Sequence, residues 1–77
     1  MAVHHFHCTN GIDMVIDKTG RDVSTADEIS SQAQAVAADL MRSVPGYHEW
    51  WNWSVHVYDA QGTVEIFDFP ADRRRAA

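Results

Sequence analysis

The 77-residue chain contains one cysteine and no apolar run of membrane-spanning length. Because Cys8 is alone, it cannot form an intramolecular disulfide, and nothing in the sequence points to an oxidising compartment. A transmembrane helix needs about 20 consecutive apolar residues, and a secretory signal begins with a basic segment followed by an apolar one. Neither pattern is present, so we expect a cytoplasmic protein that does not cross a membrane.

Basic residues are also scarce, with six Lys and Arg against eleven Asp and Glu. Three of the six, Arg73 to Arg75, lie at the extreme C-terminus, which leaves an acidic body and a basic tail. An acidic surface repels phosphate backbones, so direct binding to nucleic acid is not expected. We expect residues 1–70 to form a single domain and residues 71–77 to be a disordered basic tail.

The sequence has no glycine-rich phosphate loop, no HExxH and no CxxC. These motifs carry phosphate binding and zinc chemistry, and the parts of a nucleophilic site are missing as well. His7 follows Cys8 in the chain, but neighbouring side chains on a strand point to opposite faces. We therefore expect no enzyme activity and no obligatory cofactor.

The N-terminal third has the pattern of a β-hairpin. Residues 3–9 alternate as a strand does, and Asn10-Gly11 is a strong turn signal. A second strand is expected over residues 12–17, ended by a turn over residues 17–20 in which Gly20 takes a positive φ.

The middle of the chain predicts one helix. Thr25 and Glu28 form a capping-box pattern, and apolar residues follow at helical spacing until Pro45-Gly46 stops the helix. They are Ile29, Ala33, Val36, Ala37, Leu40 and Val44.

A second hairpin is expected over residues 52–69, with a turn at residues 59–62. Trp53, Val55 and Val57 alternate with polar residues, which is typical of a half-buried strand. The chain is thus expected to have an α+β fold of ββαββ order. Its four-stranded antiparallel sheet has strand order 2-1-3-4, and the helix packs on one face.

One helix leaves the other face of such a sheet bare, and that face should carry the function. If Phe6 points to the helix, then His5 and His7 point away from it, together with His56 and Tyr58. If Met14 and Ile16 are core residues, the bare face also gains Asp13, Val15 and Asp17. Phe67 and Phe69 lie there too if Val64 and Ile66 face the helix, although both faces of this strand carry large apolar residues. Trp50 is expected to be an exposed anchor.

The histidines allow a metal-binding alternative. His5 and His7 lie at i and i+2, and His56 follows on the neighbouring strand, so the three rings could form a zinc or copper site. The spacing matches no zinc signature, which makes this the second hypothesis.

Several short motifs together resemble a family of short bacterial domains of unknown function. They are Phe6-His7, Asn10-Gly11, the turn from Asp17 to Gly20, the alanine-rich helix after Thr25, and the spaced residues Trp53, Val55, Val57, Asp59 and Gly62. The resemblance covers nearly the whole chain except the arginine tail. It implies a small ββαββ domain without an established activity. The chain differs from the family in having His4 and His5 where aromatic residues are usual, so a metal site at His5 would be particular to this chain.

The leading hypothesis is therefore a small non-enzymatic interaction domain. It would form a homodimer or bind a protein partner through its bare sheet face or an edge strand, using Trp50, His56, Tyr58, Phe67, His5 and His7. A histidine-lined contact should weaken below about pH 6.5, where imidazole ordinarily gains a proton. A third hypothesis is an acidic inhibitor of the anti-CRISPR kind that mimics nucleic acid. It requires Asp13, Asp17, Asp22, Asp59 and Asp68 to cluster.

Overall fold

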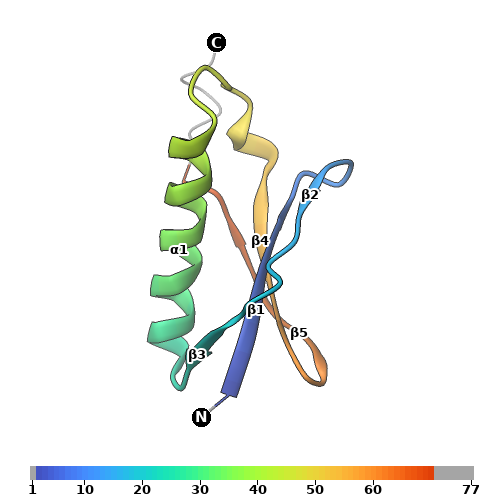
Figure 1. The fold of residues 1–77 in the computed structure, drawn as a ribbon, viewed down its shortest axis with the longest axis vertical. Helices are drawn as coiled ribbons and strands as arrows, with labels where there is room; N and C mark the ends of the chain where they lie inside the picture. Colours follow the sequence, from blue (N-terminus) through green and yellow to red (C-terminus); the bar gives the residue numbers. More distant parts are fainter. Residues whose placement is uncertain (1, 71–77) are drawn as a thin grey trace.

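The computed structural model describes residues 2–70, which form one antiparallel sheet with a helix on one side (Figure 1). In chain order the elements are β1 (Ala2–Thr9), β2 (Met14–Val15), β3 (Arg21–Val23), α1 (Ala26–Ser43), the 3-10 helix η1 (Trp50–Asn52), β4 (Ser54–Asp59) and β5 (Gly62–Asp68). The α+β class with one α-helix and an antiparallel sheet is confirmed. Within this part of the chain, no helix has the length and apolar character needed to span a membrane. The expected tail at residues 71–77 lies outside the described residues.

The sheet has five strands instead of the four that were predicted. Four of them follow the order β2-β1-β4-β5, and β3 pairs with β1 as well. β2 and β3 lie at opposite ends of β1 (Figure 1), opposite Cys8 and Thr9 and opposite residues 2–4, respectively. The predicted four-strand order is therefore not matched exactly. The additional strand, β3, has only three residues, too few to show an alternating pattern in the sequence.

The helix begins and packs as its sequence predicts. Thr25 is the N-cap: its Oγ1 accepts a hydrogen bond from the backbone N–H of Glu28 at 3.1 Å, and Oε1 of Glu28 accepts one from the N–H of Thr25 at 3.2 Å. Ala33 and Ala37 are buried against the sheet. The other buried apolar residues are Phe6, Cys8, Val23, Trp50, Trp53, Val55, Val57 and Phe69. The core thus lies between α1 and one face of the sheet.

β5 presents the opposite faces from those predicted. Phe67 pairs with Val55, and Ile66 pairs with His56. Directly opposite residues share a face, so Phe67 lies on the helix side and Ile66 on the bare side. Phe69 is also buried, at 4% exposure. The expectation that Phe67 and Phe69 lie on the bare face is wrong, because both faces of this segment are apolar and the larger aromatic rings bury more surface.

β2 also differs from its prediction. It has two residues, Met14 opposite Thr9 and Val15 opposite Cys8, so Val15 faces the helix side and Met14 the bare face. The preceding loop is held by side chains: Oδ1 of Asn10 accepts the N–H groups of Ile12 and Asp13 at 2.9 and 2.7 Å. These bonds take the place of ladder bonds, so the strand starts later than the turn signal suggested.

Candidate functional site

Four aromatic side chains gather on the bare face of the sheet. His7 pairs with His56, and His5 pairs with Tyr58, across the β1–β4 ladder. The His5 and His7 rings are stacked with centroids 6.2 Å apart, and the His7 and Tyr58 rings are 5.1 Å apart. We call His5, His7, His56 and Tyr58 the ring cluster. All four are half-buried, so each combines packed ring surface with surface open to solvent.

Asp17, in the loop between β2 and β3, forms hydrogen bonds with two rings of the cluster. Nδ1 of His5 donates to the carbonyl oxygen of Asp17 at 3.0 Å, and Nδ1 of His7 accepts the N–H of Asp17 at 3.0 Å. Because a carbonyl only accepts and an N–H only donates, His5 carries its proton on Nδ1 and His7 does not. Both ring orientations are therefore set by the backbone of one residue.

The carboxylate of Asp17 accepts three backbone hydrogen bonds, two from its own loop and one from β1. Oδ2 accepts the N–H of Phe6 at 3.1 Å, and Oδ1 accepts those of Thr19 and Gly20 at 3.1 and 3.0 Å. Burial alone would raise the pKa of Asp17, but these three donors and the charge of His5 together lower it below the ordinary carboxyl value. The Asp17 carboxylate therefore has a structural role within the domain and is not available to mimic a phosphate group.

The three histidines proposed as metal ligands lie on one face but do not form a metal site. Since Nδ1 of His7 accepts a hydrogen bond, the neutral ring carries its proton on Nε2, and neither nitrogen is left with a free lone pair for a metal. Nε2 of His56 is 3.1 Å from Oγ of Ser54. Among residues 2–70, no group of three or more His, Cys, Asp or Glu side chains could hold a metal ion. The described geometry does not support the metal hypothesis.

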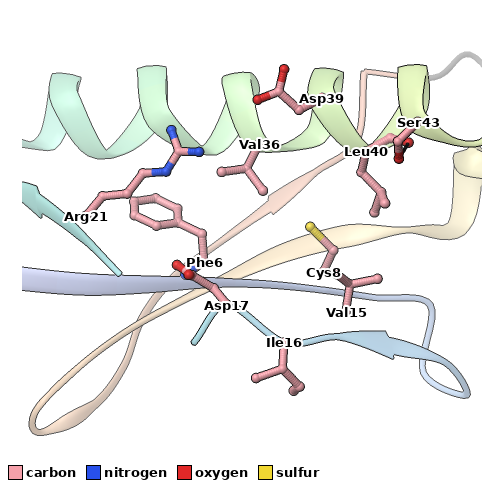
Figure 2. Close-up of a pocket in the computed structure, with 10 residues that line it drawn as sticks. All are labelled: Phe6, Cys8, Val15, Ile16, Asp17, Arg21, Val36, Asp39, Leu40 and Ser43. Atoms are coloured by element: carbon pink, nitrogen blue, oxygen red, sulfur yellow. Dashed lines mark hydrogen bonds between the residues drawn. The ribbon is translucent and has the colours of Figure 1, made fainter. Parts of the chain in front are cut away.

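Cys8 lies on the other side of the sheet from its neighbour His7. Its side chain points toward α1 (Figure 2) and the residue is 1% exposed. Burial, with a smaller effect of the nearby Asp17 charge, raises the pKa of the thiol to about 11. The reactive thiolate is thus scarce at neutral pH, which makes Cys8 a packing residue.

A cleft of about 350 Å³ lies between α1 and the β1–β2 side of the sheet (Figure 2). Its apolar lining includes Phe6, Val15 and Leu40, whereas Ile16 points away from the helix. The charged groups at its rim already have partners in the protein. Arg21 donates to Gln32, Asp39 pairs with Arg42, and Asp17 accepts its three backbone donors. The cleft therefore offers no convergent set of unused polar groups for orienting a ligand.

The predicted anchor Trp50 is a core residue. It is 7% exposed, stacks on Phe69 with ring centroids 5.7 Å apart, and packs on Tyr47 in a T-shaped arrangement with centroids 4.6 Å apart. The neighbouring Trp51 is more exposed than Trp50, at 37%. The prediction failed because residues 50–52 form a 3-10 turn, in which strand alternation does not apply. Of the predicted binding residues, Trp50 and Phe67 belong to the helix side.

The sequence-based prediction missed two surfaces. Met14, Val15 and Ile16 are consecutive, apolar and exposed beside Ile12, which is 91% exposed at the tip of the loop. A hollowed groove also runs between β5 and α1. Its sequence signal is the row of small residues on the helix, Ala26, Ser30, Ala33 and Ala37, which leaves space beside a strand.

The described residues thus define a small α+β domain whose sheet is covered by a helix on one face. The bare face carries the ring cluster, and one edge strand is open. The chain belongs to the domain family of unknown function DUF6894, whose model matches residues 3–69. No curated protein and no solved structure matches the chain.

Proposed function

We propose that this protein is a small non-enzymatic interaction domain that self-associates through the bare face of its sheet. The observation that supports this most directly is the exposure of large apolar side chains beside the ring cluster. Met14 is 52% exposed and Ile66 is 54% exposed, although both belong to strands of the sheet. Apolar surface of this kind is typical of an interaction site. A cytoplasmic location, which a lone cysteine favours, is part of the same proposal.

The occupant we propose is a second copy of the chain. Apolar side chains and neutral rings can meet the same groups across a two-fold axis, where residue i of each copy contacts residue j of the other. The area also bears on the strength of the contact. A sheet face about 20 Å long and about 20 Å wide buries roughly 400 Å² per copy, which is below the roughly 800 Å² of a standard stable interface. The dimer is therefore expected to be weak and concentration-dependent.

Acid should weaken this dimer further. Protonated imidazoles of the two copies would repel one another across the contact. Protonation of His7 on Nδ1 would also remove the acceptor for the N–H of Asp17. Association is therefore expected to be stronger at about pH 8 than at about pH 5, where imidazole ordinarily carries charge.

Sedimentation equilibrium over a range of protein concentrations tests the proposal. Met14→Glu and His56→Asp each place a negative charge on the bare face and should shift the chain toward monomer. Ala35→Glu adds the same kind of charge at an exposed position of α1 and should leave association unchanged. A monomer at every concentration, or a dimer that all three variants preserve, would contradict self-association through this face.

A further inference from the structure

β5 is an edge strand whose outer side is open. It is last in the strand order, six of its seven residues are exposed, and no other described strand pairs with its outer side. The N–H of Phe69 donates to the carbonyl of Trp53 at 3.0 Å. Because hydrogen-bonded pairs alternate along an antiparallel ladder, the backbone N–H and C=O groups of Phe67 and Glu65 also point toward β4. The backbone N–H and C=O groups of Ile66 and Asp68 therefore point outward.

A groove lies beside this edge, on the helix side of the sheet. Its first hollow, of about 240 Å³, is lined by Ala26, Ile29, Ser30, Val64, Glu65 and Phe67. Its second, of about 290 Å³, is lined by Ala33, Gln34, Ala37, Val55, Phe67, Asp68 and Pro70. Phe67 lines both hollows, so we treat them as one feature, the β5 groove. Alternate side chains of a strand added to β5 would point into this groove, because side chains alternate between faces.

The surroundings of the β5 groove carry negative charge. Glu65 and Asp68 lie on the strand, and Asp27 lies in the first turn of α1. Neither Glu65 nor Asp68 forms an ion pair within the described residues. No Lys or Arg occurs in residues 43–70, and the one Arg of α1, Arg42, pairs with Asp39. The complementary occupant is therefore basic, whereas a second β5 would place like charges together.

We propose that the outer edge of β5 binds an extended segment of a partner protein in which apolar and basic residues alternate. The segment adds to the sheet through the backbone groups of Ile66 and Asp68 and places its apolar side chains in the β5 groove. Its basic side chains lie on the opposite side of the sheet near Asp68, which pairs with Ser54, whereas Glu65 pairs with Val57 and lines the groove. Strand addition of this kind takes affinity from main-chain hydrogen bonds and specificity from the pockets beside the edge. The β5 groove lies on the other side of the sheet from the bare face, and the edge uses the backbone of Ile66 and not its side chain, so the proposal goes beyond the self-association proposed above.

The probe is a short blocked peptide of alternating valine and lysine, titrated into the isotope-labelled full chain and followed by amide NMR shifts. We expect saturable shifts at Ile66, Asp68 and Ala33, and weaker binding as salt rises because the charges are at the surface. A peptide of alternating valine and glutamate should not bind. Absence of binding by the lysine peptide to the folded chain would overturn the proposal.

Two variants test the mode of binding. Ile66→Pro removes an outward N–H at a position where an edge strand tolerates proline, and Ser30→Leu fills the groove from the helix. Each should weaken binding of the lysine peptide by about tenfold or more, as expected for a loss of about 1.4 kcal/mol. Asp22→Lys on β3 is the control and should leave binding within about twofold, since exposed single charges contribute little. If Ile66→Pro does not fold, Ser30→Leu alone decides.

Binding that Ser30→Leu or folded Ile66→Pro leaves unchanged would overturn the proposal. So would self-association that Ile66→Pro and Ser30→Leu abolish and Met14→Glu and His56→Asp preserve, because the occupant would then be a second β5. The sedimentation experiment reports on the bare face and the peptide titration on the β5 edge, so the failure of one proposal can be distinguished from the failure of the other.

Discussion

The carboxylate of Asp17 takes the place of a strand partner for Phe6. Its Oδ2 accepts the backbone N–H of Phe6 at 3.1 Å, at the point where β1 lies between the segments paired with β2 and β3. An N–H without an acceptor in the sheet would be costly if buried, and the side chain prevents that cost. The part of β1 between the two short strands is therefore hydrogen-bonded to Asp17. The backbone of the same residue also orients His5 and His7.

Asp17→Asn should destabilise the fold. The amide retains one acceptor oxygen where the carboxylate uses two, so at least one of the backbone N–H groups loses its partner. Bonds to a charged acceptor contribute about 1.5–3 kcal/mol, and because the site is partly exposed the expected loss is about 1–2 kcal/mol. Urea unfolding at neutral pH measures it. Asp22→Asn, on exposed β3, is the matched control and should change stability little.

The difference in stability between wild type and Asp17→Asn should depend on pH. The pKa of Asp17 is lower in the folded chain than its ordinary value. Its stabilising effect is therefore complete above the ordinary carboxyl pKa and is lost as pH falls through the lower folded pKa. The difference in unfolding free energy between wild type and Asp17→Asn should narrow in acid. A constant difference down to about pH 2 would contradict this role, because a carboxyl of ordinary pKa, about 3.9, is protonated there.

Gly20 is expected to tolerate a side chain less well than Gly11. Both have positive φ, +81° and +93°, so alanine strains both backbones by roughly 1–2 kcal/mol. A Cβ at Gly20 would in addition lie 2.6 Å from Cγ1 of Val3 and 3.1 Å from Cε1 of His5, whereas nothing lies within 4 Å at Gly11. Thermal unfolding should therefore show a larger loss for Gly20→Ala than for Gly11→Ala. Equal losses would mean that the packing beside His5 is loose.

The two neighbouring tryptophans should differ sharply in their effect on stability. Trp50→Ala removes a ring packed on Phe69 and Tyr47 and should cost about 3–5 kcal/mol, a large part of the stability of so small a domain. Trp51→Ala removes a ring that is 37% exposed and should cost clearly less. Chemical denaturation of both variants measures the difference. A larger effect of Trp51→Ala would contradict the packing around η1.

Cys8 should resist alkylation until the chain unfolds. Its thiol is buried, and its pKa is raised to about 11, so both access and the thiolate fraction are low at neutral pH. Modification by iodoacetamide should therefore be slow in buffer and fast in denaturant. Rapid modification of the folded chain would show that the cleft beside Cys8 opens readily.

The elements that the sequence predicts well are those whose signal is local. The capping box at Thr25 and the apolar spacing that follows it lie within one helix, so neighbours along the chain are enough to specify it. The alternation around Val55 and Val57 is equally local. The family resemblance rests on the same short patterns, and the match of residues 3–69 to a family model agrees with it.

Features that depend on distant partners were not predictable in this way. β3 is a strand only because β1 offers residues 2–4 as its partner, and its three residues carry no periodic signal. In β5 both faces are apolar, so only pairing of Phe67 with Val55 shows which face is buried. Trp50 enters the core because η1 turns the chain between α1 and β4.

By itself, the sequence determined one amphipathic helix, two hairpin patterns and a sheet with one bare face, because each follows from the spacing of apolar residues along the chain. Only the tertiary structure decided that His5 and His7 are oriented by Asp17, that Phe67 faces α1, and that β5 has an open, grooved edge. Strand pairing brings together residues far apart in sequence, and the register of those pairs sets the face of every side chain.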